Sequence, residues 1–174
     1  FFLFLLNKTT FANENIVEIL KKENNIIFIR HAIAPGNGDP SNFDILDCST
    51  QRNLGKDGEL QALKIGDFFK NNDIKITKVL SSEWCRCKDT AKIAFGNYET
   101  KNFLNSFYDK RFSENKDKQI TDFQKFIKNW NKTGNLVFVT HYVVISEILD
   151  LTTSSGEIVI TDPNLKFLSS LEIN

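Results

Sequence analysis

The chain has few of the residues that usually mark a metal or nucleic-acid site. Its 174 residues include two histidines, three cysteines, three prolines and no methionine. The 22 basic residues balance the 22 acidic ones. Because a nucleic-acid surface requires an excess of lysine and arginine, we expect no nucleic-acid partner. No apolar run reaches the roughly 20 residues of a membrane-spanning helix, so we expect no membrane span in the mature chain.

A chain of this length builds one well-buried domain. Hydrophobic residues make up 41% and charged residues 25% of it, as in ordinary globular proteins. The apolar opening, Phe1 to Leu6, is followed by polar residues and by the small residues Thr10 and Ala12. We therefore expect residues 1–12 to be the remnant of a secretory signal peptide and residues 13–174 to be a single domain. The alternative is a hydrophobic first strand.

The location of the protein follows from that expectation. Since methionine is absent, we expect the true start of the protein to be missing from the sequence. A signal peptide predicts export to a periplasm or to the outside of the cell, and the cytoplasm is the alternative. In an oxidising compartment Cys48 would pair with Cys85 or with Cys87, whereas in a reducing one all three thiols would be free.

Two apolar runs each end in one of the two histidines. Residues 26–32 end in Arg30-His31-Ala32, and residues 136–141 end in His141. Apolar runs without polar alternation are typical of parallel strands buried on both faces, and ligands bind at the carboxyl ends of such strands. We therefore predict that these strands are neighbours and that His31, His141 and Arg30 meet at one edge. The alternative is that each histidine is only a hydrogen-bonded residue at a strand end.

Phosphate chemistry fits this combination of side chains better than metal chemistry does. A metal site needs three or more ligands, and neither run offers one at the usual short spacing, so we expect no metal and no cofactor. Arginine offers a planar fork of donors that matches phosphate oxygens, and histidine serves as a nucleophile or acid near neutral pH.

The first run resembles the Arg-His-Gly signature of the histidine phosphatase superfamily, also called phosphoglycerate mutase-like, with Ala32 in place of glycine. Because alanine adopts positive φ less readily than glycine does, the turn after His31 is expected to differ. Residues 54–62 are similar to the family's Leu-Thr-x-x-Gly-x-x-Gln-Ala, with Gly55 in place of threonine. The family's Ser-Ser-x-x-x-Arg-x-x-x-Thr-Ala is matched at Ser81, Ser82, Arg86, Thr90 and Ala91.

The resemblance implies an α/β fold, a three-layer α/β/α sandwich with a mostly parallel central sheet. The hydrophobic patterns agree with it. We predict strands over 26–32, 74–80 and 136–141, helices over 14–23, 60–69, 121–130 and 143–151 and after Ser82, and a closing hairpin of 156–160 with 167–173. Residues 97–118 have no clear pattern.

The resemblance also implies an activity, that of a phosphatase acting through a phosphohistidine on His31. The attacking nitrogen must be unprotonated, so the other ring nitrogen is expected to donate to a carbonyl or carboxylate. Arg30, Arg86 and His141 would hold the phosphoryl oxygens, with Asn37 and Arg52 as further phosphate-binding candidates. The expected substrate is a small-molecule or peptide phosphate.

The family's usual proton donor, a glutamate, is missing from the segment around residues 104–106. Asp109 is the nearest acid downstream and is our candidate, and Glu83 is the other. The missing glutamate and the Arg-His-Ala turn keep a non-catalytic module that binds phosphorylated ligands open as an alternative. A phosphoglycerate-type mutase ranks third.

Overall fold

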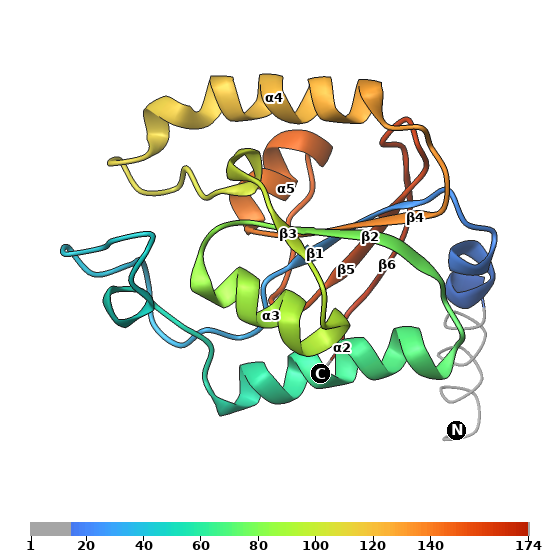
Figure 1. The fold of residues 1–174 in the computed structure, drawn as a ribbon, viewed down its shortest axis with the longest axis horizontal. Helices are drawn as coiled ribbons and strands as arrows, with labels where there is room; N and C mark the ends of the chain where they lie inside the picture. The colour runs from blue at the N-terminus through green and yellow to red at the C-terminus, as the bar shows by residue number, and fades with distance from the viewer. Residues whose placement is uncertain (1–14, 174) are drawn as a thin grey trace, which may run out of the picture.

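The computed structural model describes residues 15–173, which form a six-stranded sheet covered by helices on both faces (Figure 1). The strand order is β3-β2-β4-β1-β5-β6. The strands are β1 (Ile26–Arg30), β2 (Ile76–Ser81), β3 (Glu99–Thr100), β4 (Asn135–Thr140), β5 (Ile158–Thr161) and β6 (Phe167–Leu171). The predicted α/β sandwich is confirmed. The expected signal-peptide remnant, residues 1–12, lies outside the described residues.

The sheet is mixed rather than parallel throughout. Strands β3, β2, β4 and β1 run parallel, whereas the closing hairpin of β5 and β6 is antiparallel and adds β5 to the free edge of β1. The hairpin was predicted from the sequence. Its two strands are antiparallel to each other because a short turn can join only antiparallel strands. The parallel strands gather their carboxyl ends at one edge.

Alternate residues of β1, β2, β4 and β5 enter two separate hydrophobic cores. In β1, Ile27 and Ile29 face one core while Ile26 and Phe28 face the other, as the two-residue period of a strand requires. The first core is covered by α2 (Lys56–Asn71), α3 (Cys85–Phe95) and a helical segment over residues 15–21. The second is covered by α4 (Lys116–Asn129) and α5 (Tyr142–Leu149), on the opposite side of the sheet in Figure 1.

The predicted apolar stripes lie only partly inside these cores, because Leu60 and Leu63 in the first half of α2 are exposed. Ile65 and Phe69 of α2 pack on the first core, and Phe123 of α4 is fully buried in the second. Helix α4 begins at Lys116, one turn before the predicted start at residue 121, because its first turn is polar and carries no periodic signal. The unpatterned segment holds β3 and two short 3-10 turns, η2 (Asn102–Leu104) and η3 (Ser113–Asn115).

Two long connections project from the carboxyl edge of the parallel strands, at the left of Figure 1. One follows β1 and includes the 3-10 turn η1 (Cys48–Thr50); the other runs from η2 to α4. Loops in this position carry ligand sites in many α/β proteins. Within residues 15–173, no helix is both long and apolar enough to cross a membrane.

Candidate active site

The two histidines meet at the carboxyl edge of the sheet. Strand β1 pairs in parallel with β4 so that Arg30 lies opposite Thr140, and the next residues along the two strands are His31 and His141. Their ring centroids are 5.5 Å apart, and each residue is 3% exposed. The predicted juxtaposition is therefore present in the structure.

His31 has a defined tautomer. Its Nδ1 lies 2.8 Å from the carbonyl oxygen of Ala32. Since a carbonyl only accepts, Nδ1 carries the proton and Nε2 keeps its lone pair. Burial lowers the pKa of His31 well below its usual value, and the neighbouring Arg86 lowers it further. The ring is therefore neutral at pH 7, with its unprotonated nitrogen, Nε2, as a hydrogen-bond acceptor.

Arg86 of α3 faces that lone pair. Its Nε donates to His31 Nε2 at 3.2 Å. Its Nη1 and Nη2 donate to the two carboxylate oxygens of Asp39, at 2.8 and 3.2 Å. Burial raises the pKa of Asp39, but the hydrogen bonds and the positive charge of Arg86 outweigh this, so its pKa lies below the usual range. Asp39 and Arg86 therefore form a charged pair at the site.

His141 is held by polar groups from the loop after β2. Its Nε2 is 3.0 Å from the Ser82 hydroxyl and 3.5 Å from the Cys87 sulfur. The Ser82 hydroxyl donates its one proton to Asn105 Oδ1, so the network assigns the proton on the imidazole to Nε2. Burial and the positive charge of Arg86 lower the pKa of His141 well below its usual value. This ring is also neutral at pH 7.

The other predicted phosphate-binding residues line the same cavity, whose volume is about 240 Å³. Arg30 donates through Nη1 to the Thr153 carbonyl at 2.6 Å, and its buried Nε has no hydrogen-bond partner among residues 15–173. Arg52 donates to the carbonyls of Ala34 and Gly38. Asn37 lies on the exposed loop at the rim of the cavity. The cavity thus gathers three guanidinium groups around two neutral imidazoles.

The two candidate proton donors occupy different places. Asp109 lines the cavity, but its carboxylate is paired with Arg111 at 2.8 Å, and hydrogen bonds from Arg111 lower its pKa to about 2. Glu83 accepts a hydrogen bond from Asn105 and does not line the cavity. Asp109 is therefore ionised at neutral pH, and its role as an acid stays a prediction.

The substitution of alanine for the expected glycine leaves the loop in an ordinary conformation. Ala32 is fully buried and is not among the residues with positive φ. Its N–H donates to the Thr90 hydroxyl at 3.0 Å, and that hydroxyl donates to the Arg86 carbonyl. The matched Thr90 thus joins the His31 loop to α3.

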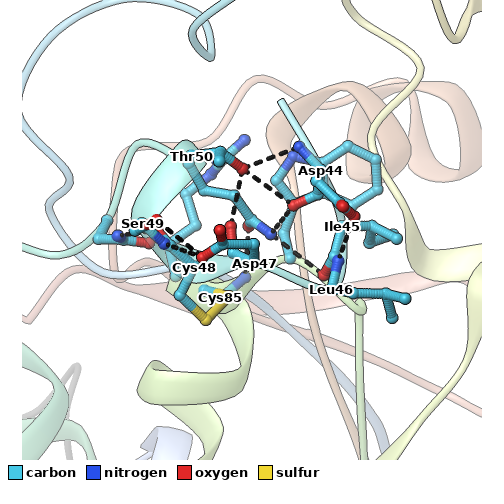
Figure 2. Close-up of a disulfide and its surroundings, with 12 residues drawn as sticks. Asp44, Ile45, Leu46, Asp47, Cys48, Ser49, Thr50 and Cys85 are labelled. Carbon is cyan, nitrogen blue, oxygen red and sulfur yellow. Dashed lines mark hydrogen bonds between the residues drawn. A yellow bond between two sulfur atoms is a disulfide. The ribbon is translucent and has the colours of Figure 1, made fainter. Parts of the chain in front are cut away.

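A disulfide links the loop after β1 to the start of α3. Figure 2 shows the bond between Cys48 and Cys85 beside a hydrogen-bonded turn formed by residues 44–50. Of the two pairings left open by the sequence, the structure contains Cys48 with Cys85. The free thiol of Cys87 is fully buried, and burial raises its pKa to about 12.

Sequence reasoning missed Asp39 and Trp84. Asp39 is in a loop with no hydrophobic period, and its only signal was an acid within the glycine- and proline-rich segment after His31. Trp84 donates to Asp39 through Nε1 at 3.2 Å, and its ring lies 5.4 Å from that of His141. No group of three or more potential metal ligands occurs within residues 15–173.

A wider groove opens from the same cavity. Its volume is about 860 Å³, and it shares Trp84, Ser106 and Phe112 with the cavity that holds the histidines. Its lining combines aromatic rings with neutral amides, including those of Asn42, Asn102, Asn105, Asn115 and Gln119. The larger groove therefore adjoins the cavity that holds the two histidines.

No protein-family model and no curated protein matches the sequence. Solved structures do match. The protein histidine phosphatase SixA complexed with tungstate is 14% identical, with a TM-score of 0.60 over 84% of this chain and 96% of that one. The putative phosphohistidine phosphatase SixA from Agrobacterium tumefaciens is 16% identical, with a TM-score of 0.60 over 85% and 97%.

A third similar structure is a phosphoglycerate mutase from Thermus thermophilus. It is 16% identical to this chain, with a TM-score of 0.59 over 86% of this chain and 99% of that one. The TM-scores and the coverage of both chains establish similarity of fold. The chain therefore has the fold of the histidine phosphatase superfamily, the phosphoglycerate mutase-like fold.

Proposed function

We propose that the protein is a phosphatase that hydrolyses a phosphorylated substrate through a phosphohistidine on His31. The observation that carries this proposal is the fixed tautomer of His31. Its Nδ1 proton goes to the Ala32 carbonyl, which leaves the Nε2 lone pair in a cavity lined by Arg30, Arg52 and Arg86. A neutral nucleophile surrounded by cationic donors matches the requirements of phosphoryl transfer.

In the proposed reaction His31 Nε2 attacks phosphorus, the bond from phosphorus to the leaving oxygen breaks, and the leaving group takes up a proton from solvent water. A water molecule then attacks the phosphorus of the phosphohistidine and the bond from phosphorus to Nε2 breaks, which releases inorganic phosphate, returns one proton to the solvent and restores the neutral ring. Arg30 and Arg86 stabilise the charge on the transferred oxygens, since they are in place before that charge spreads. His141 lines the same cavity, with its ring centroid 5.5 Å from that of His31, and we propose that it also faces the transferred oxygens.

The leaving group would occupy the larger groove. Its neutral amides both donate and accept hydrogen bonds, as suits a peptide backbone or a polar metabolite. The positive charge of Lys118 in the groove is paired with Asp122. We therefore propose a small-molecule or peptide phosphate as substrate, with one phosphoryl group between the histidines.

A binding module for phosphorylated ligands is the second candidate. One observation favours it: the carboxylate of Asp109 is occupied by Arg111, and that of Glu83 by the Asn105 amide. Without an acid to protonate the leaving group, only substrates with stable leaving groups, such as aryl phosphates, would react fast. The two candidates share one pocket and differ in whether His31 becomes phosphorylated.

His31→Ala tests the phosphatase directly. We expect it to abolish hydrolysis of p-nitrophenyl phosphate, assayed without added metal, while circular dichroism stays that of the parent. Arg86→Ala is expected to lower kcat by about 10²-fold or more, since it removes a fixed donor from the transferred oxygens.

A variant that hydrolyses the aryl phosphate as fast as the parent refutes the assignment of His31. Trapping with radiolabelled substrate separates the two candidates. Acid-labile phosphate on the parent and none on His31→Ala supports catalysis, whereas tight binding of phosphate without any trapped label supports the binding module.

Export is also proposed. The disulfide between Cys48 and Cys85 supports it, because disulfides persist in oxidising compartments and are rare in the cytosol. If residues 1–12 are the end of a signal peptide, the amino-terminal sequence of the mature protein from its native source begins near Asn13. A mature chain that retains the apolar opening contradicts this proposal.

A further inference from the structure

We propose that Asp39 is a positioning residue for Arg86: it holds the outer edge of the guanidinium so that the inner edge faces the phosphoryl position beside His31. This inference rests on the proposed function and adds a residue to it. The motifs shared with the histidine phosphatases do not include Asp39, which lies in the loop after β1.

The donors of Arg86 divide cleanly between its two edges. A guanidinium has five N–H donors in one plane. Nη1 and Nη2 donate to the Asp39 oxygens, and Nη1 also donates to the Arg52 carbonyl at 3.2 Å. Nε donates to His31 Nε2. The remaining N–H, on Nη2, lies on the same edge as Nε–H, so this edge has one further donor beside the N–H that already donates to His31.

Asp39 is itself fixed on both oxygens. Oδ1 accepts from the Arg52 backbone N–H at 3.0 Å, and Oδ2 accepts from Trp84 Nε1 at 3.2 Å. The side chains of Arg86 and Asp39 are 4% and 9% exposed. A carboxylate held by four hydrogen bonds and screened from water gives the long arginine side chain one orientation.

Orientation of this kind matters most in the transition state. A displacement of roughly 1 Å in a group that contacts the reacting atoms costs about 10²-fold in rate. Without Asp39, the outer edge of Arg86 would lose both of its carboxylate contacts, and the guanidinium would be free to turn away from His31. The expected loss therefore falls on kcat more than on KM.

Two other roles for Asp39 give different results. If Asp39 occupied the fork in competition with the substrate phosphate, its removal would tighten anion binding. If it were the acid that protonates the leaving group, its removal would abolish the basic limb of the pH profile of kcat. Positioning predicts weaker anion binding and an unchanged pH profile.

The test compares Asp39→Asn with Asp47→Asn. Asp47 is an exposed carboxylate in the same loop, outside both cavities, so its variant removes the same charge without contacting Arg86. We expect Asp39→Asn to lower kcat for p-nitrophenyl phosphate by about 10- to 100-fold. KM should change less than about threefold, tungstate binding by calorimetry should weaken, and Asp47→Asn should match the parent.

A double-mutant cycle shows whether the effect passes through Arg86. Lysine lacks the planar fork, so in an Arg86→Lys background the further change Asp39→Asn should cost less than about threefold. An equal loss of kcat on Asp39→Asn in the parent and in the Arg86→Lys background overturns the proposal. So does an Asp39→Asn variant that binds tungstate more tightly, keeps the parent kcat, or loses the basic limb of the pH profile.

A second variant and a second readout cover the cases in which Asp39→Asn does not fold or the parent shows no hydrolysis. Should Asp39→Asn not fold, Trp84→Phe removes the Nε1–H that donates to Oδ2, together with part of the ring, and a drop in kcat of about threefold is expected, with no drop counting against the proposal. Should the parent hydrolyse nothing, the phosphatase proposal fails. Tungstate that binds the parent more tightly than Asp39→Asn still supports positioning, and equal binding refutes it.

Discussion

The proton on Nδ1 of His31 is fixed by the residue that follows it. The acceptor is the Ala32 carbonyl, and the Ala32 N–H is in turn held by Thr90, whose hydroxyl bonds to the carbonyl of Arg86. The nucleophile and the arginine beside it therefore share one chain of hydrogen bonds. A change at Thr90 would alter the orientation of both.

The buried histidines make stability depend on pH. Because folding lowers the pKa of His31 and of His141, the unfolded chain binds more protons than the folded chain below about pH 6.5. We expect the free energy of unfolding to be highest above pH 6.5. It should fall as the pH is lowered to 5.5, by up to about 1.4 kcal/mol per histidine per pH unit. Urea unfolding across this range measures the slope.

The control for this slope is the double variant His31→Gln with His141→Gln, which removes both titrating groups. Its stability should change little between pH 7.5 and 5.5. If the double variant keeps the slope of the parent, other groups are responsible and the interpretation of the histidines is wrong.

Which site residues the sequence could reveal depended on their position. Arg30, His31 and His141 end strands that are apolar without interruption, and Arg86 follows a strand at a matched spacing, so their meeting at one edge was predictable. Asp39 was not, because a loop brings it 47 residues along the chain to Arg86 and no period marks such a contact. Asp109 was chosen as the candidate proton donor only because it is the nearest acid downstream along the sequence, and nothing in the sequence indicated its ion pair with Arg111.

The start of α2 supports the loop that carries the nucleophile. Gln61 accepts from the Ile33 N–H and donates to the carbonyls of Ser155 and Ile173. A Cβ at Gly58 would lie 2.0 Å from the Ile33 carbonyl oxygen. The glycine and glutamine of the matched motif thus allow the helix to approach the backbone two residues after His31.

Gly58→Ala is expected to destabilise the protein by about 1–3 kcal/mol, because the methyl group meets backbone that cannot rotate away. It should also lower kcat, since the displaced segment adjoins His31. Glu59→Ala, the exposed neighbour on the same helix, should stay within about 0.5 kcal/mol of the parent. Urea denaturation and the aryl phosphate assay provide the two readouts, and equal stability of both variants would contradict the close approach.

Among the helices and strands, those with a clear hydrophobic period were predictable from the sequence, and those without one were not. Strands β1 and β4 have strong patterns and were placed correctly, and α2 was predicted as a helix, although Leu60 and Leu63 of its predicted apolar stripe are exposed. Residues 97–118 were not interpretable, because β3 has two residues and the 3-10 turns have three each, too few to show a period. Their buried residues, Phe103 and Leu104, are held by tertiary contacts with α4.

Across the whole molecule, the disulfide joins two parts of the site that the sheet alone does not connect. Cys48 belongs to the long loop that carries Asp39 and Arg52, and Cys85 directly precedes Arg86 (Figure 2). The sequence separation between the two cysteines is 37 residues. Closing a loop of this size restricts the unfolded chain and so stabilises the folded one.

Cys48→Ser is expected to lower the free energy of unfolding by about 3–4 kcal/mol, the chain-entropy value for a loop of this length. Urea unfolding with and without a reductant measures it. The reductant should destabilise the parent to the level of Cys48→Ser and should leave the variant unchanged. Cys87→Ala, which removes the free thiol, should keep the response to reductant, and a loss of that response would indicate a different pairing.

The two tryptophans of the sequence lie in different parts of the molecule. Trp84 is 3% exposed, edge-on to His141 and bonded to Asp39, whereas Trp130 follows α4 and packs against the second core. Trp84 lines the cavity, so its indole is an intrinsic fluorophore at the cavity wall. Its emission depends on quenching by the imidazole and charged groups that surround it. With Trp130→Phe, all tryptophan emission of the protein would come from Trp84 and would report the occupancy of the cavity without any added dye.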